Sequence, residues 1–166
     1  MKKIMCAMVF IVMSVTMNSC SANNIDGKKS SAATPEATTN YSYNSSELET
    51  MKLINKYRVS IGLKALQINN YISSKCEEHT RYMIKNNDLN HNGFASRSKN
   101  IVSELGAKKV GENVAYNYQT SKAALQGWLK SAAHKENIEG DYTHFGISVL
   151  TDANGKKYYT NIFVKI

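Results

Sequence analysis

The chain has 166 residues and is basic, with 21 lysines and arginines against 13 aspartates and glutamates, for a formal net charge of +8. The basic residues are scattered, and their largest local runs are the pairs Lys108-Lys109 and Lys156-Lys157. Because a nucleic-acid-binding protein gathers its basic residues into a strip or patch, nucleic acid is excluded as the expected partner.

The first residues predict an export signal. Lys2 and Lys3 precede an apolar run, Ile4 to Val15, that is too short to span a bilayer as a stable helix. Met17-Asn18-Ser19-Cys20 then resembles the processing box of a bacterial lipoprotein, in which the cysteine becomes the acylated first residue. We expect a signal peptide over residues 1–19 and a lipid anchor at Cys20. A plain secretory signal cleaved nearby is the alternative.

A lipid anchor at Cys20 predicts a membrane partner and a place in the bacterial cell envelope, outside the cytoplasm, at the outer membrane or the cell surface. Residues 20–45 are rich in Ser, Thr, Ala and Asn and hold one large aliphatic side chain, Ile25. Such a segment buries too little apolar surface to order itself, so we expect a disordered tether. Residues 46–166 then form one domain. Its single cysteine, Cys76, rules out a disulfide within it.

Periodicity predicts two helices in the first half of this domain. The first spans about 47–60, and Gly62 ends it. The second begins at Asn69 or Asn70 and ends near Asn86-Asn87. The apolar stripe of the second helix consists of Ile72, Cys76, His79 and Met83.

The second half is predicted to alternate between strands and one helix. Residues 91–106 look like an irregular loop, and Val110 to Tyr118 like a short strand. A helix then begins after Thr120 or Ser121 and ends near His134. Its inner face would present Ala124, Leu125, Trp128 and Leu129. The runs 145–150 and 157–164 are expected to form a hairpin, with Gly155 in the turn.

Several short motifs occur in a fixed order along the domain. They are Leu53 to Arg58, Gly62-Leu63, Cys76 to Met83, His91 to Phe94 with Arg97, Gly111 to Ala115, Trp128 to His134, Asn137-Ile138, and Phe145 to Ile147. Read together, they resemble the CAP superfamily (cysteine-rich secretory proteins, antigen 5 and pathogenesis-related proteins), and most closely its compact bacterial SCP-like branch. The resemblance covers residues 48–166. It implies an α+β fold, an α-β-α sandwich whose small, mostly antiparallel sheet lies between helical layers.

The resemblance also implies a cleft lined by two histidines and two acids. His91 and His134 match the histidines, and Glu112 matches the first acid. Ser131 stands where the family has the second acid, so the resemblance implies two histidines and one acid here. In some members the two histidines bind zinc, which makes Zn2+ the one cofactor to consider here. Glu112 would then ligate the metal or only orient His91.

Other candidate residues have structural explanations. Ser131 lacks the Gly-x-Ser-x-Gly elbow of a nucleophile and would satisfy local backbone at a helix end. His79 lies on the buried stripe and is expected to bond to backbone. Cys76 is expected to be a small buried apolar residue, and Trp128 a core residue. No His-Glu-x-x-His metalloprotease motif is present.

Three functions are compatible with these residues. The first, which requires least of the cleft, is a non-enzymatic, lipid-anchored surface protein that binds a small molecule, a lipid, or a host or envelope protein. The second is a metal-dependent hydrolase or peptidase that uses His91, Glu112 and His134. The third, implied by other family members, is a carrier of sterols or fatty acids.

Overall fold

The computed structural model describes residues 40–166. The predicted signal peptide, Cys20 and most of the predicted tether therefore lie outside the described residues. Within residues 40–166, no helix is both long enough and apolar enough to cross a membrane.

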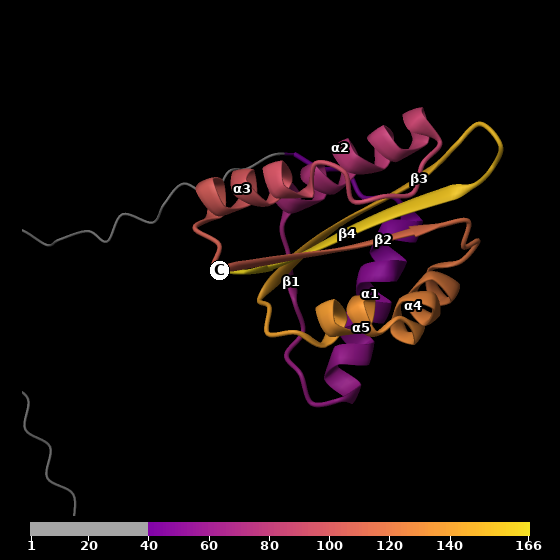
Figure 1. The fold of residues 1–166 in the computed structure, drawn as a ribbon. Coiled ribbons are helices and arrows are strands. Elements are labelled where there is room, and N and C mark those ends of the chain that lie inside the picture. Colours follow the sequence, from indigo (N-terminus) through magenta and orange to yellow (C-terminus); the bar gives the residue numbers. More distant parts are fainter. Residues whose placement is uncertain (1–39) are drawn as a thin grey trace, which may run out of the picture. The chain divides into compact units, whose positions relative to one another are not determined.

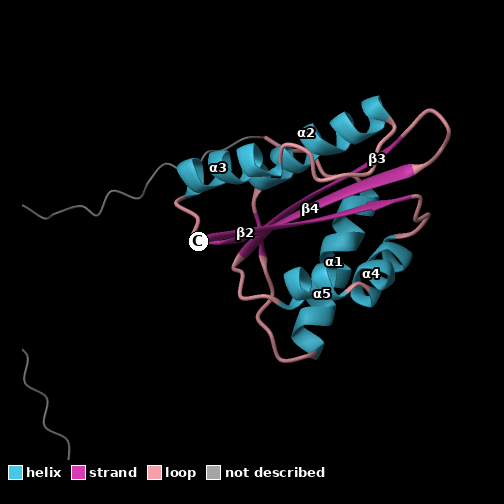
Figure 2. Cartoon of the chain, viewed as in Figure 1, coloured by secondary structure: helices cyan, strands magenta, loops and turns pink. Residues whose placement is uncertain are grey.

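Five helices and four strands make up the domain (Figures 1 and 2). In chain order they are α1 (Ser45–Ser60), β1 (Gln67–Ile68), α2 (Asn70–Asn86), α3 (Phe94–Leu105), β2 (Lys109–Tyr116), α4 (Ser121–Lys130), α5 (Ala132–Glu139), β3 (His144–Thr151) and β4 (Lys157–Lys165). The sheet has the order β1-β3-β4-β2, and only the short β1 runs parallel to its neighbour.

Helices cover both faces of this sheet, with α2 and α3 on one side and α1, α4 and α5 on the other (Figure 1). The larger core lies under α1, α4 and α5, where Trp128 packs edge-on against Tyr159 of β4. On the opposite face, Ile72 and Cys76 of α2 and Ile101 of α3 pack against β4. The expected α+β sandwich with a mostly antiparallel central sheet is confirmed.

The folded part of the chain begins earlier than the sequence indicated. Asn44 caps α1 in a capping box with Glu47, and its amide also donates to the backbone oxygen of Val149. The hydroxyl of Tyr41 donates to the Glu47 carboxylate at 2.9 Å, and that of Tyr43 contacts Ser73 of α2 at 2.9 Å. Residues from Tyr41 onwards, which the sequence placed in the tether, therefore belong to the domain.

Most of the expected elements are present. The helices near 47–60 and 70–86 are confirmed, as are the strand after residue 109 and the hairpin whose turn places Gly155 at φ 74°. The predicted burial of Ile72, Cys76, His79 and Met83 in α2 is also confirmed.

Two expectations are wrong. Residues 94–105 form the helix α3 instead of a loop, and His134 lies within a separate helix, α5, instead of at the end of α4. The helix α3 starts after Gly93, a glycine at φ 73° that supplies no side-chain cap, so the usual start signal is missing. The chain also turns sharply at Ser131, which ends α4 and begins α5 in an extended conformation.

Side chains, instead of another strand, cover the free edge of β2. The indole of Trp128 donates to the carbonyl of Val114 at 2.9 Å, and the amide of Asn137 donates to the carbonyl of Glu112 at 3.2 Å. These bonds satisfy backbone acceptors that would otherwise be free to pair with another chain. They also fix α4 and α5 beside the strand that carries Glu112.

Candidate functional site

A buried carboxylate, Glu112, lies at the centre of the candidate site. Its side chain is 1% exposed and accepts hydrogen bonds at both oxygens. The guanidinium of Arg97 donates to Oε2 from Nε at 3.0 Å and from Nη2 at 2.7 Å, and Nη2 also lies 2.8 Å from Oε1. His91 bonds to Oε1 through Nδ1 at 2.9 Å. The carboxylate is therefore held on every side by cationic or imidazole nitrogen.

Secondary structure explains why these three side chains meet. Alternation along β2 directs Glu112 towards α3 and Asn113 towards α5. Arg97 lies in the first turns of α3, directly across from Glu112. His91 lies in the connection between α2 and α3, which begins where Asn87 takes a left-handed conformation at φ 48°. The site thus depends on the register between β2 and the α2–α3 layer.

His79 holds this connection in place. Its Nε2 lies 2.7 Å from the carbonyl of Asn90, and the imidazole is 2% exposed. Burial lowers the pKa of His79, which favours the neutral ring. The prediction that His79 is a buried histidine bonded to backbone is confirmed.

Arg97 changes the chemistry available to Glu112. A carboxylate beside a histidine could act as a base or as a metal ligand, but this one is already neutralised by a buried arginine. Its remaining contact orients the ring of His91, leaving Nε2 directed away from the pair. The His91 side chain is 49% exposed, so its ring is accessible to a ligand.

His134 lies in α5, in the helical layer on the other side of β2 from Arg97. Its backbone carbonyl accepts a hydrogen bond from the amide of Asn113 at 2.9 Å, which ties α5 to the residue that follows Glu112. Burial lowers the pKa of His134, and the nearby charge of His91 lowers it further. His134 therefore favours its neutral, ligand-binding form.

Ser131 is not part of the group formed by His91, Arg97 and Glu112. It lies at the junction of α4 and α5, where its backbone N–H donates to the carbonyl of Trp128 at 3.1 Å. No hydrogen bond links its hydroxyl to His91, Glu112 or His134 within residues 40–166. Cys76 is fully buried, and burial raises the pKa of its thiol well above the ordinary value, which makes it an inert core residue as predicted.

Arg97 is the residue whose role the sequence did not reveal. It was visible only as part of an ordered motif, in a segment expected to be a loop. Once that segment is helical, Arg97 falls on the same face as Ile101, four residues on, which is fully buried. An arginine on a buried helix face needs an acidic partner, and that requirement would have pointed to Glu112.

The residues present offer a divalent metal only a partial set of ligands. His91 and His134 can each offer one imidazole nitrogen, but both oxygens of Glu112 already accept hydrogen bonds. No group of three His, Cys, Asp or Glu side chains within residues 40–166 is arranged to hold a metal ion. A four-coordinate site of this kind would leave half of its coordination positions to water and exchange its metal readily.

Curated relatives match this domain but are much longer than it. YlbC, an uncharacterized membrane protein of Bacillus subtilis, is 35% identical over 124 residues, which is 72% of this chain and 34% of that protein. YkwD, an uncharacterized protein of the same organism, is 28% identical over 108 residues, or 63% of this chain and 42% of its own length. The chain therefore spans only about a third to two fifths of these relatives.

Solved structures share the fold. An extracellular protein from Bacillus anthracis that contains an SCP domain superposes with a TM-score of 0.65 at 26% identity, over 73% of this chain and 40% of that one. An outer surface protein from Borrelia burgdorferi superposes with a TM-score of 0.63 at 21% identity, over 70% of this chain and 92% of that one. A family model of the cysteine-rich secretory protein family matches residues 51–164. The chain belongs to the cysteine-rich secretory protein family, the CAP family.

Proposed function

We propose that this protein is a non-enzymatic, lipid-anchored domain of the bacterial cell envelope that binds a ligand at the exposed imidazole of His91, with His134 as a second ligand-binding group. The proposal rests on one observation: both carboxylate oxygens of Glu112 already accept hydrogen bonds. Because Arg97 and His91 occupy both of its oxygens, the carboxylate serves to orient His91 and has no free lone-pair position for proton transfer. What remains accessible is an oriented imidazole, which suits binding.

The hydrolase alternative requires a nucleophile or an activated water next to His91. Within residues 40–166, neither the hydroxyl of Ser131 nor the thiol of Cys76 is hydrogen-bonded to either cleft histidine. A metal ion would have to supply the activated water, with two histidines as its protein ligands. This alternative therefore demands more of the cleft than binding does.

The envelope location rests on the sequence and on relatives. The signal-like residues 1–19 and Cys20 predict acylation, and similar proteins are named a membrane protein, an outer surface protein and an extracellular protein. The domain would then be held at a membrane surface by its acyl chains and displayed outside the cytoplasm.

Changing Cys20 to alanine should abolish the anchor. We expect the parent chain to incorporate labelled palmitate and to sediment with membranes, and the Cys20→Ala variant to lose both properties. Cys6→Ala is the matched control, because Cys6 lies in the part of the signal that would be removed. Membrane association that survives Cys20→Ala would contradict lipidation at this residue.

Calorimetric titration with zinc tests the cleft. With the whole chain in detergent, free of any histidine tag, we expect zinc to bind with a dissociation constant of about 1 µM or weaker, because two protein ligands are half of a closed site. The His91→Ala/His134→Ala variant should lose this binding, and His144→Ala should keep it. Zinc binding that is equal in the double variant, or absent from the parent chain, would contradict a metal-binding role for the two histidines.

A further inference from the structure

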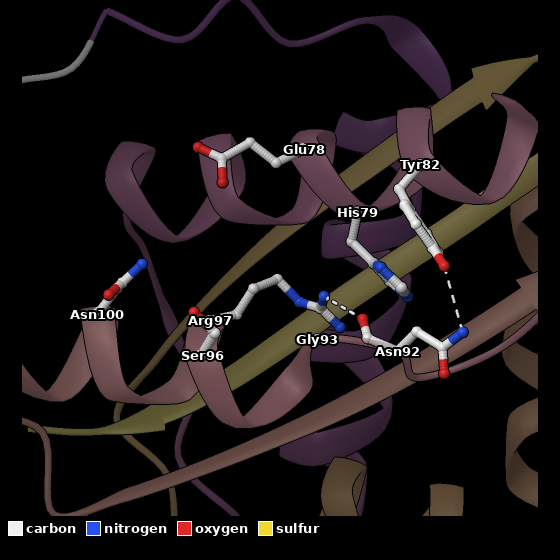
Figure 3. Close-up of a pocket in the computed structure, with 8 residues that line it drawn as sticks. All are labelled: Glu78, His79, Tyr82, Asn92, Gly93, Ser96, Arg97 and Asn100. Atoms are coloured by element: carbon white, nitrogen blue, oxygen red, sulfur yellow. Dashed lines mark hydrogen bonds between the residues drawn. The ribbon is translucent and has the colours of Figure 1, made fainter.

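A pocket lies between α2 and α3, and Arg97 is one of the residues that line it. It has a volume of about 320 Å³, at the lower end of the range for small-molecule sites. The helix α2 contributes Glu78, His79 and Tyr82, and α3 with the residues just before it contributes Asn92, Gly93, Ser96, Arg97 and Asn100 (Figure 3). Neither cleft histidine lines it.

Asn92 joins the two walls of this pocket. Its backbone carbonyl accepts a hydrogen bond from Arg97 Nη1 at 2.7 Å, and its side-chain amide donates to the hydroxyl of Tyr82 at 3.2 Å (Figure 3). Its own backbone N–H donates to the side chain of Asn90 at 2.8 Å. The pocket is therefore held open in one shape before any ligand arrives, which lowers the entropic cost of binding.

Charge argues against an ionic ligand. The guanidinium of Arg97 is neutralised by the buried carboxylate of Glu112 and gives the pocket little positive potential. Glu78 is exposed and lies 2.6 Å from the ammonium group of Lys75, so its negative charge is also compensated. The pocket therefore favours a neutral ligand.

The polar groups left free can both donate and accept hydrogen bonds. Among residues 40–166, no side-chain hydrogen bond is made by Ser96 or Asn100, and both are exposed. A hydroxyl and an amide in one pocket match a ligand that carries several hydroxyl or acetamido groups.

An aromatic wall completes the pattern. The rings of His79 and Tyr82 stack with their centroids 5.8 Å apart and their planes 14° apart, and Tyr82 is 41% exposed. A flat wall of this kind packs against an apolar face, while the polar groups around it bind the ligand's edge. Sugar rings have this dual character, with C–H groups on their faces and hydroxyls around their edges.

We infer that the pocket between α2 and α3 binds a neutral saccharide, one sugar ring or a disaccharide, independently of the His91–His134 cleft. Such a ligand is available to a protein displayed at a cell envelope, so its biological setting rests on the proposed location. The binding itself rests only on the residues of the pocket.

Titration of the whole chain in detergent with N,N′-diacetylchitobiose, followed by calorimetry, tests this inference. This disaccharide is neutral and carries both hydroxyl and acetamido groups. We expect saturable binding. Tyr82→Ala removes the aromatic wall and Asn100→Ala removes a hydrogen-bonding group, so each variant should bind the disaccharide about tenfold more weakly. Both residues are exposed, so both variants should fold.

Two controls separate this site from the cleft. Tyr118 is 36% exposed and does not line the pocket, so Tyr118→Ala should bind as the parent chain does. The His91→Ala/His134→Ala variant should also bind normally, even though zinc binding is lost. The inference is overturned if no binding is seen up to about 20 mM disaccharide, if Tyr82→Ala binds unchanged, or if the double histidine variant loses the sugar.

Discussion

Replacing Arg97 with alanine is expected to destabilise the folded protein by about 3–5 kcal/mol, because removing one partner of a buried ion pair leaves the other charge uncompensated. The carboxylate of Glu112, which is 1% exposed in the parent chain, would keep only His91 as a side-chain partner. The substitution also removes the guanidinium contact to Asn92, which positions the connection that carries His91. Chemical denaturation followed by circular dichroism would measure the free energy of unfolding.

Arg81 provides a matched control for this experiment. It is also an arginine on a helix and also pairs with a glutamate, Glu77, but its side chain is 67% exposed. An exposed pair at this spacing contributes about 0.3–0.5 kcal/mol, so Arg81→Ala should change the free energy of unfolding very little. Equal effects of Arg97→Ala and Arg81→Ala would show that the Arg97–Glu112 pair is not buried in solution.

A double substitution separates charge from packing. Replacing both members, as Arg97→Met with Glu112→Leu, removes the unpaired charge and should recover most of the stability lost in Arg97→Ala. His91 would nevertheless lose the carboxylate that orients it. We therefore expect a folded double variant whose zinc binding is weakened, which would assign the pair a positioning role in the cleft in addition to its structural one.

The sequence predicted the elements that are specified by apolar spacing or by a turn glycine. The stripe Ile72, Cys76, His79 and Met83 has helical spacing, and the hairpin carries glycine where the turn needs positive φ, so both could be read directly. The helix α3 could not, because its start at Gly93 has no side-chain cap. Its buried face is also interrupted by a charged residue, Arg97, which makes the segment resemble a polar loop.

The candidate site was only partly predictable for a related reason. His91, Glu112 and His134 could be singled out through the resemblance to a family, but their contacts depend on how β2 is placed between the two helical layers. The Arg97–Glu112 pair joins residues 15 positions apart in sequence and on different elements. The periodicity of residues within a single element cannot predict such a contact between two elements. The pocket between α2 and α3 was missed because one of its walls was expected to be a loop.

Replacing Gly146 with alanine is expected to destabilise the protein by about 3 kcal/mol or more, because the added methyl group has no space and its neighbours are mainly backbone. A Cβ at this position of β3 would lie 2.3 Å from the backbone nitrogen of Ser73 and 2.6 Å from the carbonyl carbon of Ile72. Both belong to the first turn of α2, so the helix itself would have to move away from the sheet. Denaturation of Gly146→Ala and the parent chain would measure the loss.

Gly127 gives the matched control, since it also lacks space for a methyl group but for a different reason. There a Cβ would lie 2.3 Å from the hydroxyl oxygen of Tyr118, the far end of a partly exposed side chain that can turn aside. Alanine also favours the interior of α4 by up to about 1 kcal/mol over glycine. Gly127→Ala should therefore be neutral or slightly stabilising.

The Gly146→Ala variant also links the fold to the pocket between α2 and α3. The helix α2 carries Glu78, His79 and Tyr82, so a shift of α2 away from β3 would move one wall of the pocket relative to Asn92 and α3. If the variant remains folded, its affinity for the disaccharide should fall although no pocket residue has changed. A Gly146→Ala variant as stable as the parent chain would mean that α2 does not lie against β3 as closely as the structure places it, and the pocket's α2 wall would be misplaced with it.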